Sequence, residues 1–315
     1  MPQATFLVTG AAGFIGSNLV EHLLAQGAKV IGMDNFITGK RANVAPFADR
    51  MTFVEGDVRD LDLCRRLCQG VDYVLHEAAL GSVPRSVDDP LTTHDHNANG
   101  TLNVLVAARD AGVKRVVFAA SSAAYGDTEV LPKVETMPAN PLSPYAVTKL
   151  VGEQYCSVFH RVYGQGTVAL RYFNVFGPRQ DPDGMYAAVI PRFLQALLRG
   201  QRPVIYGDGE QTRDFCFVEN VVQANLKACT APAEACGQVF NVGAAGRVSL
   251  NALLEHLCRL LGTDLTAVYE PTRAGDVRDS QADIGKAQRL LGYAPEFDVF
   301  AGLDRAIDWY RKHLG

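Results

Sequence analysis

The sequence predicts an α/β fold: a doubly wound parallel sheet with helices on both faces, followed by a smaller C-terminal α/β domain. Two observations support this prediction. Short apolar runs alternate with helical patterns through residues 1–173, and a glycine-rich turn follows the first run. The alternation indicates parallel strands joined by helices. The runs lack polar alternation, which indicates strands that are buried on both faces.

Six strands and three helices are expected in the first domain. The strands are residues 5–9, 28–33, 51–55, 72–76, 115–119 and 166–171, and the helices are 14–24, 101–111 and 146–163. A loop-rich second domain is expected over residues 174–315, because glycine, proline and charged residues punctuate the chain from 174 to 214. The prediction allows some segments of residues 174–315 to belong to the first domain. Its helices are expected at 190–199, 218–229, 250–261, 284–291 and 301–313. This domain would close a cleft at the carboxyl ends of the strands.

Composition limits the classes of function. The 315 residues allow about two domains, and 48% hydrophobic with 20% charged residues is typical of a soluble globular protein. A net charge of −4 gives no electrostatic reason to expect nucleic-acid binding. No apolar run approaches the ~18–20 residues of a membrane span, and no signal-peptide pattern is present, so a cytoplasmic location is expected. Seven dispersed cysteines fit reduced thiols better than disulfides, and no metal site is expected.

The glycine-rich turn has the spacing of a dinucleotide site. Gly10, Gly13 and Gly16 lie between the first strand and a helix that begins with Phe14 and Ile15. Glycines let the turn approach a pyrophosphate closely, and the helix N-terminus offers free N–H groups to the phosphates. In this context the turn indicates a Rossmann-type fold, although glycine-rich turns also occur for packing alone.

Acidic residues follow the second and third strands. Asp34 ends the second strand, where a carboxylate can accept hydrogen bonds from the ribose diol and would repel a 2′-phosphate. Asn35 follows it rather than Arg or Lys, so NAD is favoured over NADP. Asp57 and Val58 follow the third strand and could contact the adenine edge. The alternative for Asp34 is a solvated carboxylate at a strand end.

A tyrosine and a lysine four residues apart indicate proton-transfer chemistry. Tyr145 and Lys149 face the same side of an expected helix, and a lysine cation lowers the pKa of a nearby phenol. Such a tyrosine can take a proton from a sugar hydroxyl while hydride leaves the same carbon. Ser121 or Ser122, at the end of the fifth strand, could relay that proton, with a turn or cap role as the alternative.

Together these motifs resemble the extended short-chain dehydrogenase/reductase family, and within it the UDP-sugar 4-epimerases, over essentially the whole chain. Beside the residues above, the motifs that carry the resemblance are His76-Glu-Ala-Ala79, Asn97-Ala-Asn-Gly-Thr101, Ser143-Pro-Tyr-Ala-Val-Thr-Lys149, Arg171-Tyr-Phe-Asn-Val-Phe-Gly177, Gly207-Asp-Gly209 through Arg213-Asp214, and Arg273-Ala-Gly-Asp-Val277. The resemblance implies NAD as the cofactor. The residues that would hold it are those named above in the glycine-rich turn and at the ends of the second and third strands, together with Ala78, Asn97, Tyr145, Lys149 and Tyr172.

The resemblance also implies roles in a reaction. Tyr145 is the base, Lys149 holds the nicotinamide ribose and tunes Tyr145, and Ser121 assists, with Ser122 as the adjacent alternate. The 4-hydroxyl of the sugar loses its proton to Tyr145 as hydride passes to NAD, the 4-keto sugar turns over, and hydride returns to the opposite face. Dehydratases of the family place Asp-Glu after the equivalent hydroxyl residue, and decarboxylases carry a Glu nearby. Here Ser122-Ala-Ala124 follows instead, without a carboxylate.

A UDP-sugar site in the second part of the chain is implied by the same resemblance. Its residues are Ser82, Ser121, Ser122, Asn174, Gln180, Ala188, Val189, Tyr206, Arg213, Arg273, Asp276 and Ser280. Arg213 and Arg273 would bind the diphosphate, for which arginine is a forked donor. The small residue Ser280 would admit a 2-acetamido group, which favours UDP-GlcNAc and UDP-GalNAc, with UDP-Glc and UDP-Gal accepted as well. The alternative is that Ser280 is an ordinary polar loop residue.

Two other hypotheses stay open. One is another NAD-dependent nucleotide-sugar enzyme, either a decarboxylase, a dehydratase or a reductase. The other is an NAD-binding regulatory protein without turnover, although binding alone does not need the activated phenol of Tyr145. The resemblance further implies a homodimer that forms through the helices 101–111 and 146–163.

Overall fold

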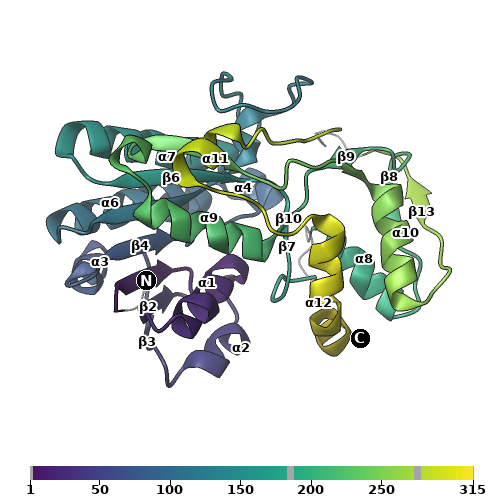
Figure 1. Cartoon of the computed structure of the whole chain (residues 1–315), viewed down its shortest axis with the longest axis horizontal. Coiled ribbons are helices and arrows are strands. Elements are labelled where there is room, and N and C mark those ends of the chain that lie inside the picture. Colours follow the sequence, from purple (N-terminus) through teal and green to yellow (C-terminus); the bar gives the residue numbers. More distant parts are fainter. Residues whose placement is uncertain (1–2, 183–187, 273–277, 315) are drawn as a thin grey trace.

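The centre of the protein is a parallel sheet of seven strands, in the order β11-β6-β5-β4-β1-β2-β3 (Figure 1). The computed structural model describes residues 3–182, 188–272 and 278–314. The strands of this sheet are β1 Thr5–Thr9, β2 Lys29–Asp34, β3 Thr52–Glu55, β4 Tyr73–His76, β5 Arg115–Ser121, β6 Thr167–Tyr172 and β11 Gln238–Val242. Every pairing within the sheet is parallel. The predicted Rossmann-type fold is therefore confirmed.

Helices cover both faces of the sheet. The helices around it are α1 Phe14–Ala25, α2 Arg41–Val44, α3 Leu61–Cys68, α4 Val83–Asp88, α5 Pro90–His94, α6 Gly100–Asp110, α7 Pro144–Tyr163, α9 Val218–Thr230 and α11 Gly285–Leu291. α1 packs against α9 on one face, and α3 and α6 pack together with α7 on the other. A π-helical turn, Asp95–Asn99, joins α5 to α6. Two separate apolar cores hold these layers to the sheet.

A smaller lobe lies beside the sheet, at the right of Figure 1. Its helices are α8 Val189–Leu198, α10 Leu250–Leu261 and α12 Val299–Leu314, which share a third apolar core. Its short strands pair as β7 Val175–Phe176 with β10 Cys216–Phe217, β8 Val204–Tyr206 with β13 Val268–Glu270, and β9 Thr212–Arg213 with β12 Val248–Ser249. The division of the chain at residue 173 stays a prediction.

The order of the strands places a ligand site. The chain runs from β1 outward to β3 and then crosses back to β4 on the other side of β1. In open parallel sheets, ligands bind outside the carboxyl ends of the strands at such a switch point. The segments that follow β1 and β4 meet at this switch point, so a ligand site is expected between them.

The structure adds elements to those expected, among them the helices α2, α3, α4 and α5 and the short strands of the smaller lobe. The sheet has a seventh strand, β11, which pairs with β6 although it follows the second-domain segments in sequence. β5 also continues to Ser121, two residues beyond its expected end, so that this hydroxyl belongs to the last residue of the strand. Within the described ranges, no helix combines the length and apolar character that a membrane crossing requires.

Candidate active site

The turn after β1 forms a cradle of backbone atoms. Gly10 has a φ of +67°, which favours glycine, and a Cβ there would lie 2.8 Å from the backbone nitrogen of Ala78. A Cβ on Gly16 would overlap the carbonyl oxygen of Gly10. Gly13 is the N-cap of α1, and no side chain caps the helix there. The free N–H groups of the first turn of α1 are therefore left for an anion.

Asp34 lies at the carboxyl end of β2, next to this cradle. Its carboxylate accepts hydrogen bonds from the backbone N–H groups of Ala12, at 2.9 Å, and Phe36, at 2.7 Å. Burial raises the pKa of Asp34, and these N–H groups act in the opposite direction. The side chain is thus held in one orientation at the edge of the cavity described next.

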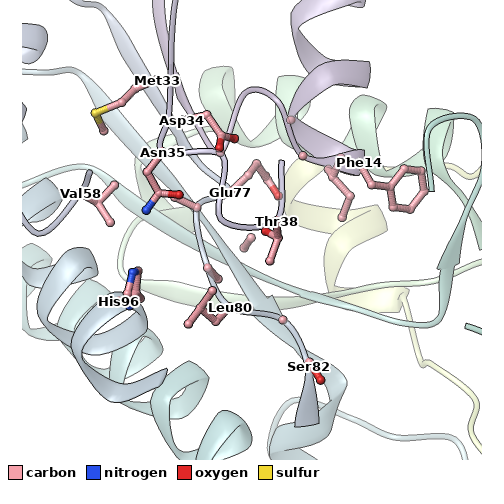
Figure 2. Close-up of a pocket in the computed structure, with 18 of the residues that line it drawn as sticks. Phe14, Met33, Asp34, Asn35, Thr38, Val58, Glu77, Leu80, Ser82 and His96 are labelled. Atoms are coloured by element: carbon pink, nitrogen blue, oxygen red, sulfur yellow. The ribbon is translucent and has the colours of Figure 1, made fainter. Parts of the chain in front are cut away.

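A cavity of about 460 Å³ opens over the carboxyl ends of β1, β2 and β4. Figure 2 shows its wall, with Asp34, Asn35, Val58 and His96 toward one side and Phe14 toward the other. Most of the predicted cofactor residues line it: Gly10, Gly13, Phe14, Ile15, Gly16, Asp34, Asn35, Val58, Ala78, Tyr145, Lys149 and Tyr172. The cavity therefore joins the glycine turn to the tyrosine–lysine pair in one elongated site.

Two predicted cofactor residues lie elsewhere. The Asp57 carboxylate accepts hydrogen bonds from Asn35 and from the side chain of Arg59, at 2.8 Å to each on Oδ2. Burial acts to raise the pKa of Asp57, but these hydrogen bonds outweigh it and hold that pKa well below its ordinary range. The Asn97 amide bonds both backbone groups of Leu80 and the hydroxyl of Thr148. Neither residue belongs to the lining of the cavity, so their cofactor contacts stay predictions.

The reactive end of the cavity is formed by α7 and the end of β5. Ser143 caps α7 by accepting from the Ala146 N–H, and the helix carries Tyr145 and Lys149 into the cavity. Burial raises the pKa of Tyr145, and a hydrogen bond with the Ser121 side chain acts against that rise. The structure thus brings Ser121 and Tyr145 together, as predicted.

Lys149 does not act on Tyr145 in the expected way. Its Nζ donates to the carbonyl oxygen of Ala119 at 2.7 Å and lies 6.0 Å from the centroid of the Tyr145 ring. The expected lowering of the Tyr145 pKa by the lysine is corrected: burial of the phenol raises that pKa, and Ser121 rather than Lys149 acts against the rise. Burial also lowers the pKa of Lys149 itself, while the nearby carboxylates of Glu77 and Glu153 act to raise it.

A second cavity, of about 260 Å³, lies in the smaller lobe. Five of the predicted substrate residues line it: Asn174, Ala188, Val189, Tyr206 and Arg213. Asn174 donates to the hydroxyl of Ser280 at 3.0 Å. Gln180 donates to the carbonyl oxygen of Val175 at 2.9 Å. Neither Ser280 nor Gln180 belongs to the lining of this cavity. Ser82 lines the larger cavity, where it caps α4. Arg273 and Asp276 lie outside the described residues.

Comparison with known proteins is consistent with this geometry. The profile of the NAD dependent epimerase/dehydratase family matches residues 6–243. The chain belongs to the NAD-dependent epimerase/dehydratase family. A putative UDP-glucose 4-epimerase from Methanocaldococcus jannaschii is 41% identical over 98% of both chains. The structure of a UDP-N-acetylglucosamine 4-epimerase from Methanobrevibacter ruminantium, in complex with UDP-N-acetylmuramic acid, superposes with a TM-score of 0.94 at 39% identity over 99% of both chains.

The cofactor of this family enzyme is NAD. The structure of a Thermus thermophilus UDP-glucose 4-epimerase in complex with NAD, 36% identical, superposes with a TM-score of 0.88 and covers 98% of this chain and 99% of that one. The residues present fit a dinucleotide, because the cradle of Gly10 and Gly16 has no room for a Cβ and the start of α1 has no side-chain cap. The described part of the chain holds no cluster of three or more metal-ligating side chains.

Several polar residues that line the cavities were not among the predicted site residues, and Glu77, His96 and Arg192 are three of them. Glu77 accepts a hydrogen bond from Tyr172 at 2.8 Å, and burial raises its pKa. His96 lines the larger cavity, and Arg192 lines the smaller one. Glu77 could have been found, because it directly follows β4 at the edge where the glycine turn lies. The sequence carries no comparable signal for His96, which depends on the π-helical turn, or for Arg192, which depends on how α8 packs.

Proposed function

We propose that this family enzyme is a UDP-sugar 4-epimerase. The observation that carries the proposal is the position of Tyr145 in the NAD cavity, on the helix that also carries Lys149, with no carboxylate on the two residues that follow Ser122. A dehydration would need a further acid and base beside Ser121, whereas an epimerisation needs only the tyrosine. The relatives named UDP-glucose and UDP-N-acetylglucosamine 4-epimerases support the same reaction.

The residues divide the work of such a reaction. Tyr145 takes the proton of the 4-hydroxyl, and Ser121, at the end of β5, would hydrogen-bond the same sugar oxygen. Lys149, whose Nζ donates to the Ala119 carbonyl and lines the cavity, would hold the nicotinamide ribose. Bound NAD supplies the hydride acceptor and donor for C4. Arg213 and Asn174, on the wall of the second cavity, would hold the diphosphate while the sugar turns.

The proposed substrates are UDP-GlcNAc and UDP-GalNAc, with UDP-Glc and UDP-Gal also accepted. Ser280 is small, and its hydroxyl is held by Asn174 beside the second cavity. Ala188, on the wall of that cavity, is small too. The relative that binds UDP-N-acetylmuramic acid supports a pocket that admits an acetamido group.

We further propose a homodimer in which α7 contributes to the interface. Four large apolar residues of α7 are exposed: Val147, Val158, Val162 and Tyr163. Exposed Val83, Val87 and Leu91 lie on α4 and α5, which pack beside α7. None of the large exposed apolar residues identified in the described chain is on α6, the other helix expected to contribute.

The test is an NMR time course of the purified protein with UDP-GlcNAc or UDP-Glc in separate tubes and no added electron donor. We expect UDP-GlcNAc to become UDP-GalNAc, and UDP-Glc to become UDP-Gal. Tyr145→Phe should slow both conversions by about 10²–10⁴-fold while NAD stays bound. Conversion of UDP-Glc alone would refute the substrate preference. No conversion of either sugar, even with added NAD, would refute the 4-epimerase, and unaltered turnover by Tyr145→Phe would refute the proposed base.

A further inference from the structure

Asp214 is a fully buried carboxylate next to the second cavity. It lies between β9 and β10, directly after Arg213, which lines that cavity. Burial raises the pKa of Asp214 to about 6, and backbone N–H groups that donate to the carboxylate act against that rise. The side chain is therefore ionised in neutral solution. Burying a charge is costly unless it is well hydrogen-bonded, so the contacts of this carboxylate indicate what it does.

The two oxygens of the carboxylate bind two segments that are far apart in the sequence. Oδ1 accepts a hydrogen bond from the N–H of Ala244 at 2.9 Å, in the loop that follows β11. Oδ2 accepts from the N–H of Ala282 at 3.0 Å. The approach depends on Gly243, because a Cβ there would lie only 2.8 Å from Oδ2. One side chain thus joins both segments to the chain between β9 and β10.

The segment that contains Ala282 lies beside the second cavity. The N–H of Ser280 donates to the carbonyl oxygen of Thr212 at 3.1 Å, so residues 280–282 run alongside residues 212–214. The hydroxyl of Ser280 accepts from the side chain of Asn174, which lines the cavity. The hydrogen bond between Asp214 and Ala282 therefore fixes a segment that reaches the cavity wall two residues earlier.

Asn174 is held in an uncommon backbone conformation by the same part of the chain. Its φ is +29°, in a region that residues other than glycine rarely adopt. Its amide donates to the backbone carbonyl oxygen of Asp214 at 3.1 Å as well as to Ser280, and its own carbonyl oxygen accepts from the N–H of Cys216 at 3.2 Å. Such conformations persist where neighbours hold them, and they cluster at ligand sites.

We propose that Asp214 is a positioning residue of the substrate site: its carboxylate holds the backbone at Ala244 and Ala282 in place. It thereby sets where Asn174 and Ser280 lie beside a nucleoside diphosphate sugar. The inference rests on the proposed function, which assigns the second cavity to that ligand. Asp214 itself is buried and does not touch the ligand, so its loss should weaken binding in the ground state and the transition state alike. KM then rises while kcat is unchanged.

The test compares two variants of the full, NAD-loaded protein. Asp214→Asn keeps the shape of the side chain but sets an amide group against the backbone donors. Gly243→Ala keeps the charge and crowds Oδ2, and it decides alone should Asp214→Asn fail to fold. Both should weaken the binding of UDP in calorimetry by about tenfold. They should raise KM for the sugar nucleotide by the same factor, with kcat within about twofold of the wild type.

Gly246→Ala is the matched control, because it lies in the same loop as Gly243 and its new Cβ meets open space. It should bind UDP as the wild type does. Unchanged UDP affinity in the two test variants would overturn the proposal. A fall in kcat at an unchanged KM would do so too, because a merely structural role lowers the amount of folded enzyme without changing its affinity.

The outcome for the proposed function is separate. Weaker UDP binding by both variants, with conversion of neither UDP-GlcNAc nor UDP-Glc by the wild type, would support the role of Asp214 and refute the 4-epimerase. Normal conversion by the wild type with equal UDP affinity in all variants would refute the role of Asp214 alone. A wild-type protein that binds no UDP would overturn both.

Discussion

At the scale of single residues, Glu77 is the least expected group of the active site. Its carboxylate accepts from the Tyr172 hydroxyl, which in turn accepts from Asn225 at 2.8 Å. Glu77 also acts to raise the pKa of Lys149, against the effect of burial. The other carboxylate near Lys149, that of Glu153, accepts hydrogen bonds from Nε and Nη2 of Arg171, at 2.8 and 2.7 Å. Glu77 is thus the less engaged counter-charge of the lysine.

Glu77→Gln should therefore shift the pH dependence of turnover. Without the anion, burial of Lys149 is opposed less, its pKa falls further, and its ammonium is lost at lower pH. The alkaline limb of kcat/KM should move down by roughly one pH unit. Glutamine still offers Tyr172 an acceptor, so a purely structural role would leave the limb in place. Tyr172→Phe, which breaks the hydrogen bond and keeps the charge, is the control, and a limb shifted equally in both variants would contradict this prediction.

Ser280 offers a test of substrate size. Ser280→Tyr should lower kcat/KM for UDP-GlcNAc by about tenfold relative to UDP-Glc, because the ring would fill the space for the acetamido group. Ser280→Ala removes the hydrogen bond from Asn174 while it keeps the side chain small, so the ratio of the two substrates should stay as in the wild type. Steady-state kinetics with both sugars measures the ratio, and equal losses for both substrates in Ser280→Tyr would contradict the size argument.

Site residues could be predicted from the sequence where their role follows from residue type and position. Properties that depend on a neighbouring side chain could not be predicted. Gly10 and Asp34 were recognisable, because a strand end and a glycine turn constrain what those atoms can do. The contact of Asp57 with adenine stays a prediction, and the structure adds a hydrogen bond from Arg59 to its carboxylate that the sequence did not indicate. The pKa of Tyr145 was misjudged for the same reason, since burial depends on the packing of several distant segments.

At the scale of elements, α7 shows how packing positions chemistry. Gly152 lies where α7 crosses β5, and a Cβ there would overlap the ring of Phe118. The same helix carries Tyr145 and Lys149, so the closeness of its approach to the sheet sets where both side chains lie. Phe118 also contacts Lys149, whose Nζ is 5.1 Å from the centre of the ring.

Gly152→Ala should consequently affect both stability and turnover. Overpacking at such a site costs roughly 1–3 kcal/mol of the free energy of unfolding, and displacement of α7 should lower kcat more than it weakens NAD binding. Denaturant unfolding and steady-state kinetics measure the two effects. Gly246→Ala is the control, because a Cβ there meets open space and the φ of Gly246 is not in the left-handed region. A Gly152→Ala protein as stable and active as the control would show that α7 tolerates displacement.

Strands made of continuous apolar residues were predicted from the sequence, whereas a strand that mixes polar and apolar residues was not. β1 and β6 are buried along nearly their whole length and were predicted from their apolar runs. β11 mixes polar and apolar residues, since Gln238 and Asn241 interrupt its apolar side chains, and so it lacked that pattern. Asn241 is nevertheless fully buried, because its amide bonds the Tyr125 hydroxyl and two backbone carbonyls. Hydropathy alone does not identify a strand whose buried polar side chains are satisfied by long-range hydrogen bonds.

At the scale of the whole molecule, two ionic contacts tie the segment after β7 to the rim of the NAD cavity. Lys40 lies 2.9 Å from Asp181, and Arg179 binds Glu21 and Asn18 of α1. Lys40, Arg179 and Asp181 all line the cavity. The segment that leads from the sheet into the smaller lobe therefore also borders the cofactor.

Asp181→Asn should speed the release of NAD. The Lys40–Asp181 pair is about half exposed, so its loss should raise the dissociation rate by only about two- to fivefold at low salt. The difference from wild type should shrink as ionic strength rises, because added salt screens the intact pair. Displacement of bound NAD by excess labelled NAD gives the rates, and equal rates at low salt would show that this contact does not restrain the cofactor.

The exposed apolar side chains on α4, α5 and α7 make a prediction about assembly. Such a patch over packed helices is typical of an interface between subunits. Val162, at 65%, has the largest exposed fraction of the four exposed apolar residues named on α7. Val162→Asp places a charge in the proposed interface, where desolvation would be costly, so it should shift the wild-type dimer toward monomer in sedimentation-velocity experiments. Val130→Asp is the matched control, because Val130 is 59% exposed and lies in the loop between β5 and α7, on none of the three helices of the patch. A monomeric wild type would refute the dimer itself. A Val162→Asp protein that sediments like the control would instead show that the subunits meet elsewhere and that α7 faces solvent.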